Sequence, residues 1–364
     1  MDHSHHAHHG ESALQWRIGE WSVMAHGFVN AIHDEQGGPR GDSKNFSNSM
    51  FMAVAERPLD AATLELRGML SLDPAMGKGG YPLLFQAGET ANGRDHLIDR
   101  QHPHDFFMEL AARYRRDWSG GSWFVYAGLP GEPALGPPAF MHRASGVRIP
   151  EAPLTHHWLD STHITFGVVT LGVQRGDWTF ELSRFNGREP DQYRWNIETH
   201  SLDSTSVRVT WNPAPGWSLQ ASHGDIRSPE ALEPSQYVRR DTVSAIYEGR
   251  LAGRPWAATF AWGRNDKRRP HTHYHLPGWL IESTIEPAEG HAAFIRAERI
   301  THDEASVPLT FRKVSIGYIY DVARTGPVRW GVGALVSDLR PDGLVTVFYG
   351  DRPNAYMVFL QARF

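Results

Sequence analysis

Apolar and polar residues alternate along much of this chain, and the alternation is clearest at its C-terminal end. Tyr356, Val358, Leu360, Ala362 and the terminal Phe364 occupy every second position, with residues of the opposite phase between them. Successive side chains of a strand point to opposite faces, so this pattern predicts a strand with one continuous apolar face. Its length, about ten residues, is the length that a tilted strand needs to cross a bilayer.

The same alternation recurs upstream and predicts an all-β fold. About fourteen strands are expected, an even number as in antiparallel barrels of the bacterial outer membrane, and about twelve to sixteen stay open because one long stretch is hard to assign. The segments lie near residues 20–32, 46–56, 63–71, 162–174, 177–185, 204–212, 216–224, 239–249, 255–263, 278–286, 291–300, 311–321, 328–337 and 355–364.

Short and long connections alternate between these segments. The short ones, such as 174–177, 212–216 and 324–327, carry the Gly and Pro residues of tight turns. Short periplasmic turns opposite long extracellular loops are typical of an antiparallel transmembrane β-barrel, which we expect over residues 15–364. The longer polar stretches, predicted as extracellular loops, are 186–203, 227–238, 264–277, 302–311 and 337–354.

The stretch 72–161 breaks the pattern. Pro103 stands where a helix would begin, and Asp105 and Glu109 suit the positive end of its dipole. The apolar positions 106, 107, 110 and 114 would form one helical face, which predicts a helix near 103–115. An insert of about 90 residues is too long for an idle loop, so we expect it to plug the barrel lumen.

The amino-acid composition excludes several classes of protein and favours a membrane barrel. The formal net charge of −5 gives no sign of a nucleic-acid partner, and the absence of cysteine excludes disulfides, thiolate zinc sites and a cysteine nucleophile. The 13 tryptophans and 11 tyrosines suit membrane-interface girdles. No run of about 18 apolar residues predicts a transmembrane helix. The chain also lacks the apolar core of a signal peptide, so we expect the export signal to have been removed.

The 21 histidines are the main candidate chemistry, and five of them lie in a tail over residues 1–14. Neutral imidazoles at this density bind Cu(II), Ni(II) or Zn(II) readily. The alternative interpretation of this tail is a purification tag. The tail histidines are His3, His5, His6, His8 and His9.

A second group lies in the predicted insert, where His102, His104, Asp105 and Met108 are the candidate metal ligands. Two histidines that flank a proline beside acidic residues are able to ligate a metal. The alternative is that they cap the helix and bond loop backbone in a polar lumen, since no known zinc spacing is present. Other members of this group are His96, Asp99, Arg100, Glu109, Met141, His142, His156, His157, Asp160 and His163.

A third group, His271, His273 and His275, occupies alternate positions of a predicted extracellular loop and would share one face of an extended chain. A solvated polar loop is the alternative. In the first strand Met24 and His26 should face the lumen, which suggests a soft path for Cu(I). Methionine as a gap-filler of packed interiors is the alternative there.

Three segments resemble known proteins. The strand ending on Phe364 resembles the closing strand of outer-membrane barrels, whose last residue is read by the barrel-assembly machinery. The start Met-Asp-His-Ser-His-His resembles, over about ten residues, the His/Met-rich N-terminal segments of copper-resistance outer-membrane proteins. The string from Asp99 to Asp105 resembles segments of uncharacterised barrel proteins from metal-resistance contexts. These resemblances imply a Gram-negative outer-membrane protein in contact with outer-membrane lipid and the assembly machinery.

Three functions compete. The first is binding or passage of a metal ion, most of all copper, with zinc or nickel as alternatives and no cofactor needed for folding. The second is a porin-like or structural barrel. Its lumen would be lined by charges such as Arg184, Arg208, Lys313 and Arg329.

The third function is an outer-membrane lipid hydrolase, with Ser161, His163 or His157, and Asp160 as candidate nucleophile, base and orienter. No flanking motif supports it, so whether the chain is an enzyme stays open. A soluble β-sandwich is the competing fold.

Overall fold

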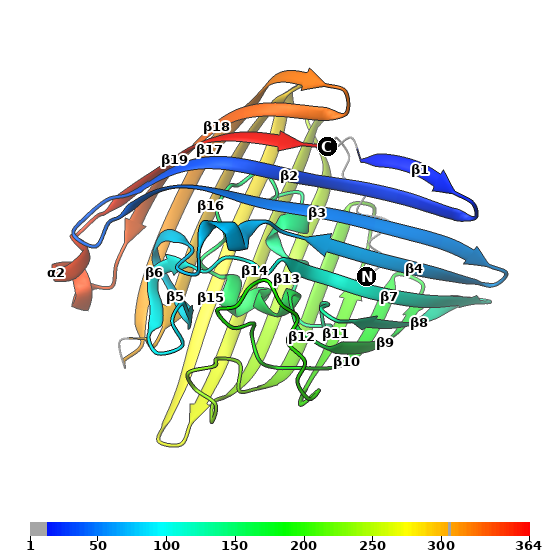
Figure 1. Cartoon of the computed structure of the whole chain (residues 1–364), viewed down its shortest axis with the longest axis horizontal. Helices are drawn as coiled ribbons and strands as arrows, with labels where there is room; N and C mark the ends of the chain where they lie inside the picture. Colours follow the sequence, from blue (N-terminus) through cyan, green and yellow to red (C-terminus); the bar gives the residue numbers. More distant parts are fainter. Residues whose placement is uncertain (1–12, 305–306) are drawn as a thin grey trace.

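The wall of this protein is one antiparallel sheet that closes on itself (Figure 1). In the computed structural model, which describes residues 13–304 and 307–364, the sheet has 17 strands, of which 16 form the closed circuit. The remaining strand, β1 (Leu14–Ile18), pairs with the first strand of the circuit. The 16 wall strands are β2 (Trp21–Gln36), β3 (Ser43–Leu59), β4 (Ala62–Leu70), β7 (Phe107–Trp118), β8 (Gly121–Gly128), β9 (Val168–Arg175), β10 (Trp178–Phe185), β11 (Ser204–Trp211), β12 (Trp217–Arg227), β13 (Tyr237–Leu251), β14 (Arg254–Arg269), β15 (Thr272–Ala288), β16 (His291–His302), β17 (Leu309–Thr325), β18 (Val328–Arg340) and β19 (Asn354–Arg363).

The last strand closes the barrel against the first. β19 pairs with β2 from Ala355↔Gln36 to Arg363↔Phe28, and Phe364 and Gly27 exchange two backbone hydrogen bonds of 3.0 Å. The predicted closing strand is confirmed, and the closed circuit rules out the two-sheet sandwich.

The period-two pattern separates two very different faces. Tyr356, Val358 and Leu360 of β19 are exposed on the outside, whereas Met357 and Phe359 are buried inside. An apolar side chain gains nothing from facing water, so the outward apolar row is suited to lipid. Aromatic rings gather near the short turns, where Tyr247 lies 5.0 Å from Trp217 and 5.1 Å from Trp256. None of the helices in the described residues is long and apolar enough to span a membrane.

The predicted helix over 103–115 is wrong, and with it the count of fourteen strands. Residues 107–118 form the wall strand β7, and the next segment forms β8. A β-bulge at Met108 explains the error, because Met69 pairs with Glu109 while Leu70 pairs with Phe107. The extra residue puts Met108 and Glu109 both inside, which breaks the alternation and imitates a helical spacing.

The hairpin β7–β8 divides the predicted insert into two segments, 71–106 and 129–167, which together we call the lumen insert. It lies inside the wall, where Arg143 bonds Glu282 of β15 at 2.7 Å and Glu151 bonds Lys313 of β17 at 2.6 Å. Most of its residues are buried. It contains β5 (Tyr81–Thr90), β6 (His96–Gln101), α1 (His156–Leu159) and the 3₁₀ turns η2 (Asp73–Met76), η3 (Phe140–His142) and η4 (Ser161–His163).

Two further details differ from the expected loops. The stretch 264–277 is not a loop, since β14 and β15 extend to a tight turn at residues 270–271. Between β18 and β19 the chain forms η5 (Gly343–Val345) and a single turn, α2 (Thr346–Tyr349). In Figure 1 this turn stands at the far left, at the end of the barrel that carries the long loops.

Candidate functional site

Five histidines of the lumen insert come together inside the barrel, and we call His102, His104, His156, His157 and His163 the lumen histidine cluster. The ring of His163 lies 5.1 Å from that of His156 and 5.5 Å from that of His104, centroid to centroid. His157 lies 5.4 Å from His156 and 5.6 Å from His102. Residues some 60 positions apart in the sequence therefore share one site.

Hydrogen bonds fix one nitrogen of four of these rings, and in His102 this is Nδ1, which lies 3.1 Å from the Pro103 carbonyl. Nδ1 of His104 lies 2.9 Å from Asp73 Oδ2, and Nδ1 of His156 lies 2.7 Å from Asp160 Oδ1. Nδ1 of His163 donates to the Asp160 carbonyl at 2.8 Å. A carbonyl or carboxylate on Nδ1 selects the tautomer that leaves Nε2 as the acceptor.

In His104 and His163 the opposite nitrogen, Nε2, is buried and makes no hydrogen bond. Nε2 of His157 is also buried without a hydrogen bond, whereas Nε2 of His102 lies 3.1 Å from Oε1 of Glu89. A buried polar atom without a partner is costly and uncommon, so a ligand for these atoms would relieve the cost. A cavity of about 20 Å³, room for one water-sized ligand, lies against His102 and His104.

Burial keeps these imidazoles neutral. It lowers the pKa of His163 to about 3 and that of His157 to about 4. Burial also lowers the pKa of His102 well below its usual range, and that of His156 in spite of the nearby Asp160 carboxylate. A neutral imidazole is the form that ligates a metal.

A methionine group adjoins the cluster. Phe140 connects the two, because its ring lies 6.0 Å from that of His104 and 5.8 Å from that of His156. Thioethers are soft ligands as well as good gap-fillers. Met24 packs against this group from β2, and His26 is buried, as expected for lumen-facing residues. The buried methionines of the group are Met50, Met52, Met69, Met108 and Met141.

The other candidates of the insert have structural partners. Asp105 receives a hydrogen bond of 3.0 Å from Arg194, and burial raises the pKa of this carboxyl well above its usual range. Arg194 also bonds Glu89, whose Oε1 lies 3.1 Å from His102 Nε2. Met108 is buried at the bulge of β7 and shares no helical face with His104. Asp105 thus holds the loop that carries the cluster.

Among the described residues, ligand atoms of three residues lie within 4.8 Å of one another at two places, neither of them in the lumen histidine cluster. One is Asp266, His273 and His275 at the tip of the β14–β15 hairpin, where Nε2 of His273 contacts Asp266; His271 is not part of it. The other, His96 with Glu230 and Glu304, already holds the ammonium of Lys267 at 3.2 Å and 3.4 Å from the two glutamates. The Lys267 ammonium thus already neutralises the carboxylates that a metal ion would need as ligands.

The hydrolase arrangement does not form. Ser161 Oγ accepts a hydrogen bond of 3.0 Å from Arg240, and Nδ1 of His163 bonds a backbone carbonyl. Neither Ser161–His163 nor Ser161–His157 is a hydrogen-bonded pair among the described residues, so neither histidine is placed to activate Ser161.

Charged residues of the lumen differ in part from the expected set. Arg208 and Lys313 are buried inside, and Arg329 pairs with Asp321 at 3.6 Å, but Arg184 is exposed on the outer face. Its phase follows the outward Leu182, which the alternation itself indicates.

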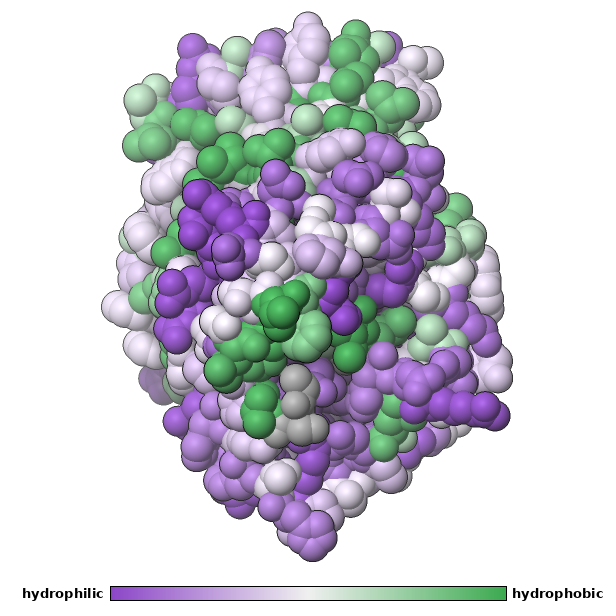
Figure 2. Space-filling model, turned by 90° about the vertical axis from the view of Figure 1, so that its left-hand side faces the viewer, coloured by the Kyte–Doolittle hydropathy of each residue, from purple (hydrophilic) through white to green (hydrophobic). Residues whose placement is uncertain are grey.

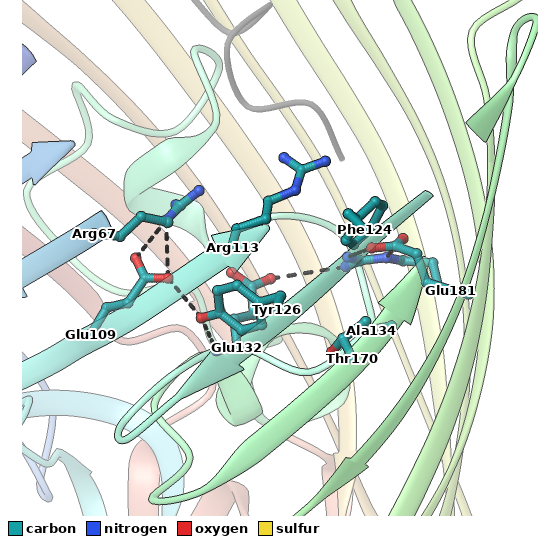
Figure 3. A pocket seen from close by; sticks show the side chains of 10 residues that line it. Arg67, Glu109, Arg113, Phe124, Tyr126, Glu132, Ala134, Thr170 and Glu181 are labelled. Carbon is teal, nitrogen blue, oxygen red and sulfur yellow. Dashed lines mark hydrogen bonds and ion pairs between the residues drawn. The ribbon is translucent and has the colours of Figure 1, made fainter. Parts of the chain in front are cut away.

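A pocket between the insert and the wall strands β4 and β7–β11 is lined by such charges (Figure 3). Glu109 accepts hydrogen bonds from Arg67 at 3.1 Å and from the Tyr126 hydroxyl at 2.7 Å. Arg208 forms a bidentate pair with Glu181 at 2.7 and 3.0 Å. The charges are thus mostly neutralised within the pocket.

The acidic partners of the lumen histidine cluster were not predicted from the sequence. Asp73 and Glu89 lie far from the histidines in the chain, and nothing in the sequence signals their contacts. His156 and Asp160 are four residues apart, a spacing that brings side chains together on a helical turn. The five tail histidines, His3 to His9, lie outside the described residues.

Solved structures of similar fold identify the class. The anion-selective porin of Comamonas acidovorans has a TM-score of 0.61 at 10% identity, with 95% of this chain and all of that chain covered. OprB of Pseudomonas putida has a TM-score of 0.60 at 10% identity, with 94% of each chain covered. OmpF of Salmonella typhi has a TM-score of 0.59 at 11% identity, covering 96% of this chain and all of that one.

This chain therefore has the fold of the β-barrels of the Gram-negative outer membrane, and its outward apolar face is consistent with that location. Within that class its 16-stranded wall resembles those of the porins. No protein-family model and no curated protein sequence matches the chain. Identities near 10% show the fold alone.

Proposed function

We propose that this barrel binds a transition-metal ion, copper before zinc or nickel, at the lumen histidine cluster. One observation carries the proposal: imidazoles of the cluster have Nδ1 anchored and Nε2 buried without a partner. Metal-ligating histidines have this arrangement, because the bond on Nδ1 orients the ring and raises the basicity of Nε2.

The spacing of the rings suits coordination of one metal ion by two histidines. Two imidazoles bound to one tetrahedral ion at about 2.0–2.1 Å have centroids about 5 Å apart. The separations from His163 to His156 and to His104 are 5.1 and 5.5 Å. Since the three ligand atoms do not meet within 4.8 Å, binding requires side-chain rotation about χ1 or χ2. Copper is preferred because thioethers of the methionine group lie beside the rings.

Calorimetry with Cu(I), Cu(II) and Zn(II) tests the proposal, using detergent-refolded barrel that lacks residues 1–12 so that the histidine tail cannot contribute. We expect about one copper ion per barrel, bound about tenfold or more weaker in His163→Gln. His302→Gln is the matched control, because His302 is also buried with an unpartnered Nε2 but lies outside the cluster. Undiminished binding in His163→Gln overturns the assignment.

A double variant, His273→Gln/His275→Gln, separates the hairpin tip from the lumen. Loss of binding in this variant alone would move the metal site to Asp266, His273 and His275. Heat-modifiable migration in gels verifies that each variant has folded.

Passive conduction is the second candidate function, favoured by the likeness to porins. The lumen insert opposes it, because buried residues of 71–106 and 129–167 fill the space inside the wall. Planar-bilayer recording separates the two functions. A steady ohmic conductance of the refolded wild type would favour conduction.

A further inference from the structure

Three arginines stand side by side on the outer face of the barrel, and we call Arg299, Arg312 and Arg340 the arginine row. Arg299 of β16 is the register partner of Arg312 of β17, which is in turn the partner of Arg340 of β18. All three side chains are exposed. They lie at the long-loop, extracellular ends of their strands.

The row borders the apolar band directly. On β17 the outward positions from Val314 to Val322 are apolar or aromatic, and Arg312 and Arg324 flank them. At about 3.3 Å per residue and a tilt near 40°, such a run spans roughly 20–25 Å, the height of a lipid-facing band. The arginine row therefore lies at the level of the outer-leaflet headgroups. The apolar register partners nearer the membrane centre are Ile295, Ile316 and Val336.

Little negative charge neutralises the row. Asp338 accepts a hydrogen bond of 3.1 Å from Arg340 and another from Arg352. Arg299 and Arg312 make no ion pair and no hydrogen bond with any residue of 13–304 or 307–364. Like charges directly opposite each other across two strands destabilise a sheet. An anion bound between the guanidinium groups would remove this repulsion.

Apolar side chains project beside the row. Leu344, Val347 and Phe348 of the β18–β19 connection are 75%, 79% and 59% exposed. They are not a mobile tip, because Tyr349 of the same turn is buried and donates to Asp99 at 3.0 Å. Figure 2 faces the end of the barrel that carries this turn and shows an apolar patch bordered by hydrophilic surface.

We propose that the arginine row binds the phosphates of an outer-leaflet glycolipid, with its acyl chains along Ile295, Ile316 and Val336. Guanidinium groups bind phosphate bidentately and in parallel, which three neighbouring arginines allow. The apolar wall below them decides the ligand class. A free phosphate would use only the arginines, whereas a phosphorylated lipid uses both halves of the surface.

Native mass spectrometry of the refolded full chain, titrated with lipid A in detergent, tests this site. We expect one tightly held lipid A, and an apparent affinity at least about tenfold lower in Arg299→Gln/Arg312→Gln, because the variant removes two of the three guanidinium groups that would bind phosphate. The double variant leaves Arg340 and its Asp338 pair intact. Arg254→Gln is the matched control, an exposed arginine at the opposite end of the barrel.

Three results overturn the site. Equal lipid A binding by the double variant and the wild type removes the arginines from it. Equal affinity for phosphatidylglycerol, which carries a single phosphate, removes the assignment to a multiply phosphorylated glycolipid. Displacement of lipid A by millimolar pyrophosphate shows a small-anion site instead.

Discussion

Lys313 of the barrel wall and Glu151 of the lumen insert form a fully buried ion pair, with Nζ 2.6 Å from Oε2. The Ser315 hydroxyl donates to the other carboxylate oxygen at 3.1 Å. Nearby, Glu282 of β15 accepts from Arg143 of the insert at 2.7 Å and from Arg296 of β16 at 3.0 Å. The insert is thus bound to strands β15–β17 through charges that water does not reach.

Removing one partner of such a pair should be costly. Glu151→Ala leaves the Lys313 ammonium buried and unpaired, so we expect the free energy of unfolding to fall by about 3–5 kcal/mol. Glu20→Ala is the control, because both side chains of its ion pair with Arg57 are exposed and the pair should contribute less than about 1 kcal/mol. Urea titration in detergent measures both. Equal costs would contradict a buried anchor.

Glu132 of the insert should make stability depend on pH. Burial raises its pKa from 4.5 to about 7, although Arg208 lies 3.9 Å away. The folded protein then holds a proton that the unfolded chain releases above about pH 4.5. This contribution is complete below that pH and is lost as the pH rises through about 7.

Glu132→Gln should therefore stabilise the barrel relative to wild type at pH 8.5, by roughly 2–3 kcal/mol, and much less at pH 4.5. Unfolding curves at the two pH values measure the difference. Glu20→Gln is the control, because this side chain is 69% exposed and its charged form is not destabilised by burial. A gain that does not change with pH would refute the raised pKa.

The wall was largely predictable, because alternation in one chain directly reports which face of a strand is apolar. Prediction failed at β7, where one bulged residue, Met108, places two consecutive side chains inside. It failed again at Arg184, which was assigned by charge although its phase is that of Leu182. A single residue shifts the phase of a strand, and periodicity alone does not show where.

For the candidate site, the sequence predicts that histidines are abundant in the insert but not which of them lie together. The density of histidines near 102–104 and 156–163 is visible in the sequence, but their approach depends on how two separate segments fold inside the wall. Asp73 and Glu89, which contact His104 and His102, carry no local signal. Contacts between distant residues of an irregular insert leave no periodic pattern in the sequence, so they could not be predicted from it.

Asp73 should act as a positioning residue for His104. Asp73→Ala removes the acceptor on Nδ1, so we expect copper affinity to fall by about 10–100-fold. Asp73→Asn keeps an oxygen at this place and should retain most of the affinity. The Asp73 carboxylate also accepts from the Ser49 backbone at 2.8 Å, so a thermal unfolding curve of each variant is needed beside the calorimetry. Identical affinities in both variants would rule out this role.

The lipid-facing band makes a prediction that burial alone does not. Ile316 and Val322 both lie on the outer face of β17 and are equally exposed, at 55% and 54%. Ile316 lies one outward position from Tyr318, the middle of the apolar run, and Val322 lies next to Arg324 at its edge. Arginine at the bilayer midplane costs about 2–4 kcal/mol, and about 0–1 kcal/mol near the interface.

Ile316→Arg should therefore destabilise the barrel in lipid vesicles several-fold more than Val322→Arg, although the two side chains are equally exposed. Equilibrium folding into vesicles, followed by tryptophan fluorescence, measures both free energies. In detergent micelles, where no fixed bilayer depth exists, the difference should shrink. Equal costs in vesicles would mean that the band at Ile316 is not centred in the membrane, and the level assigned to the arginine row would move with it.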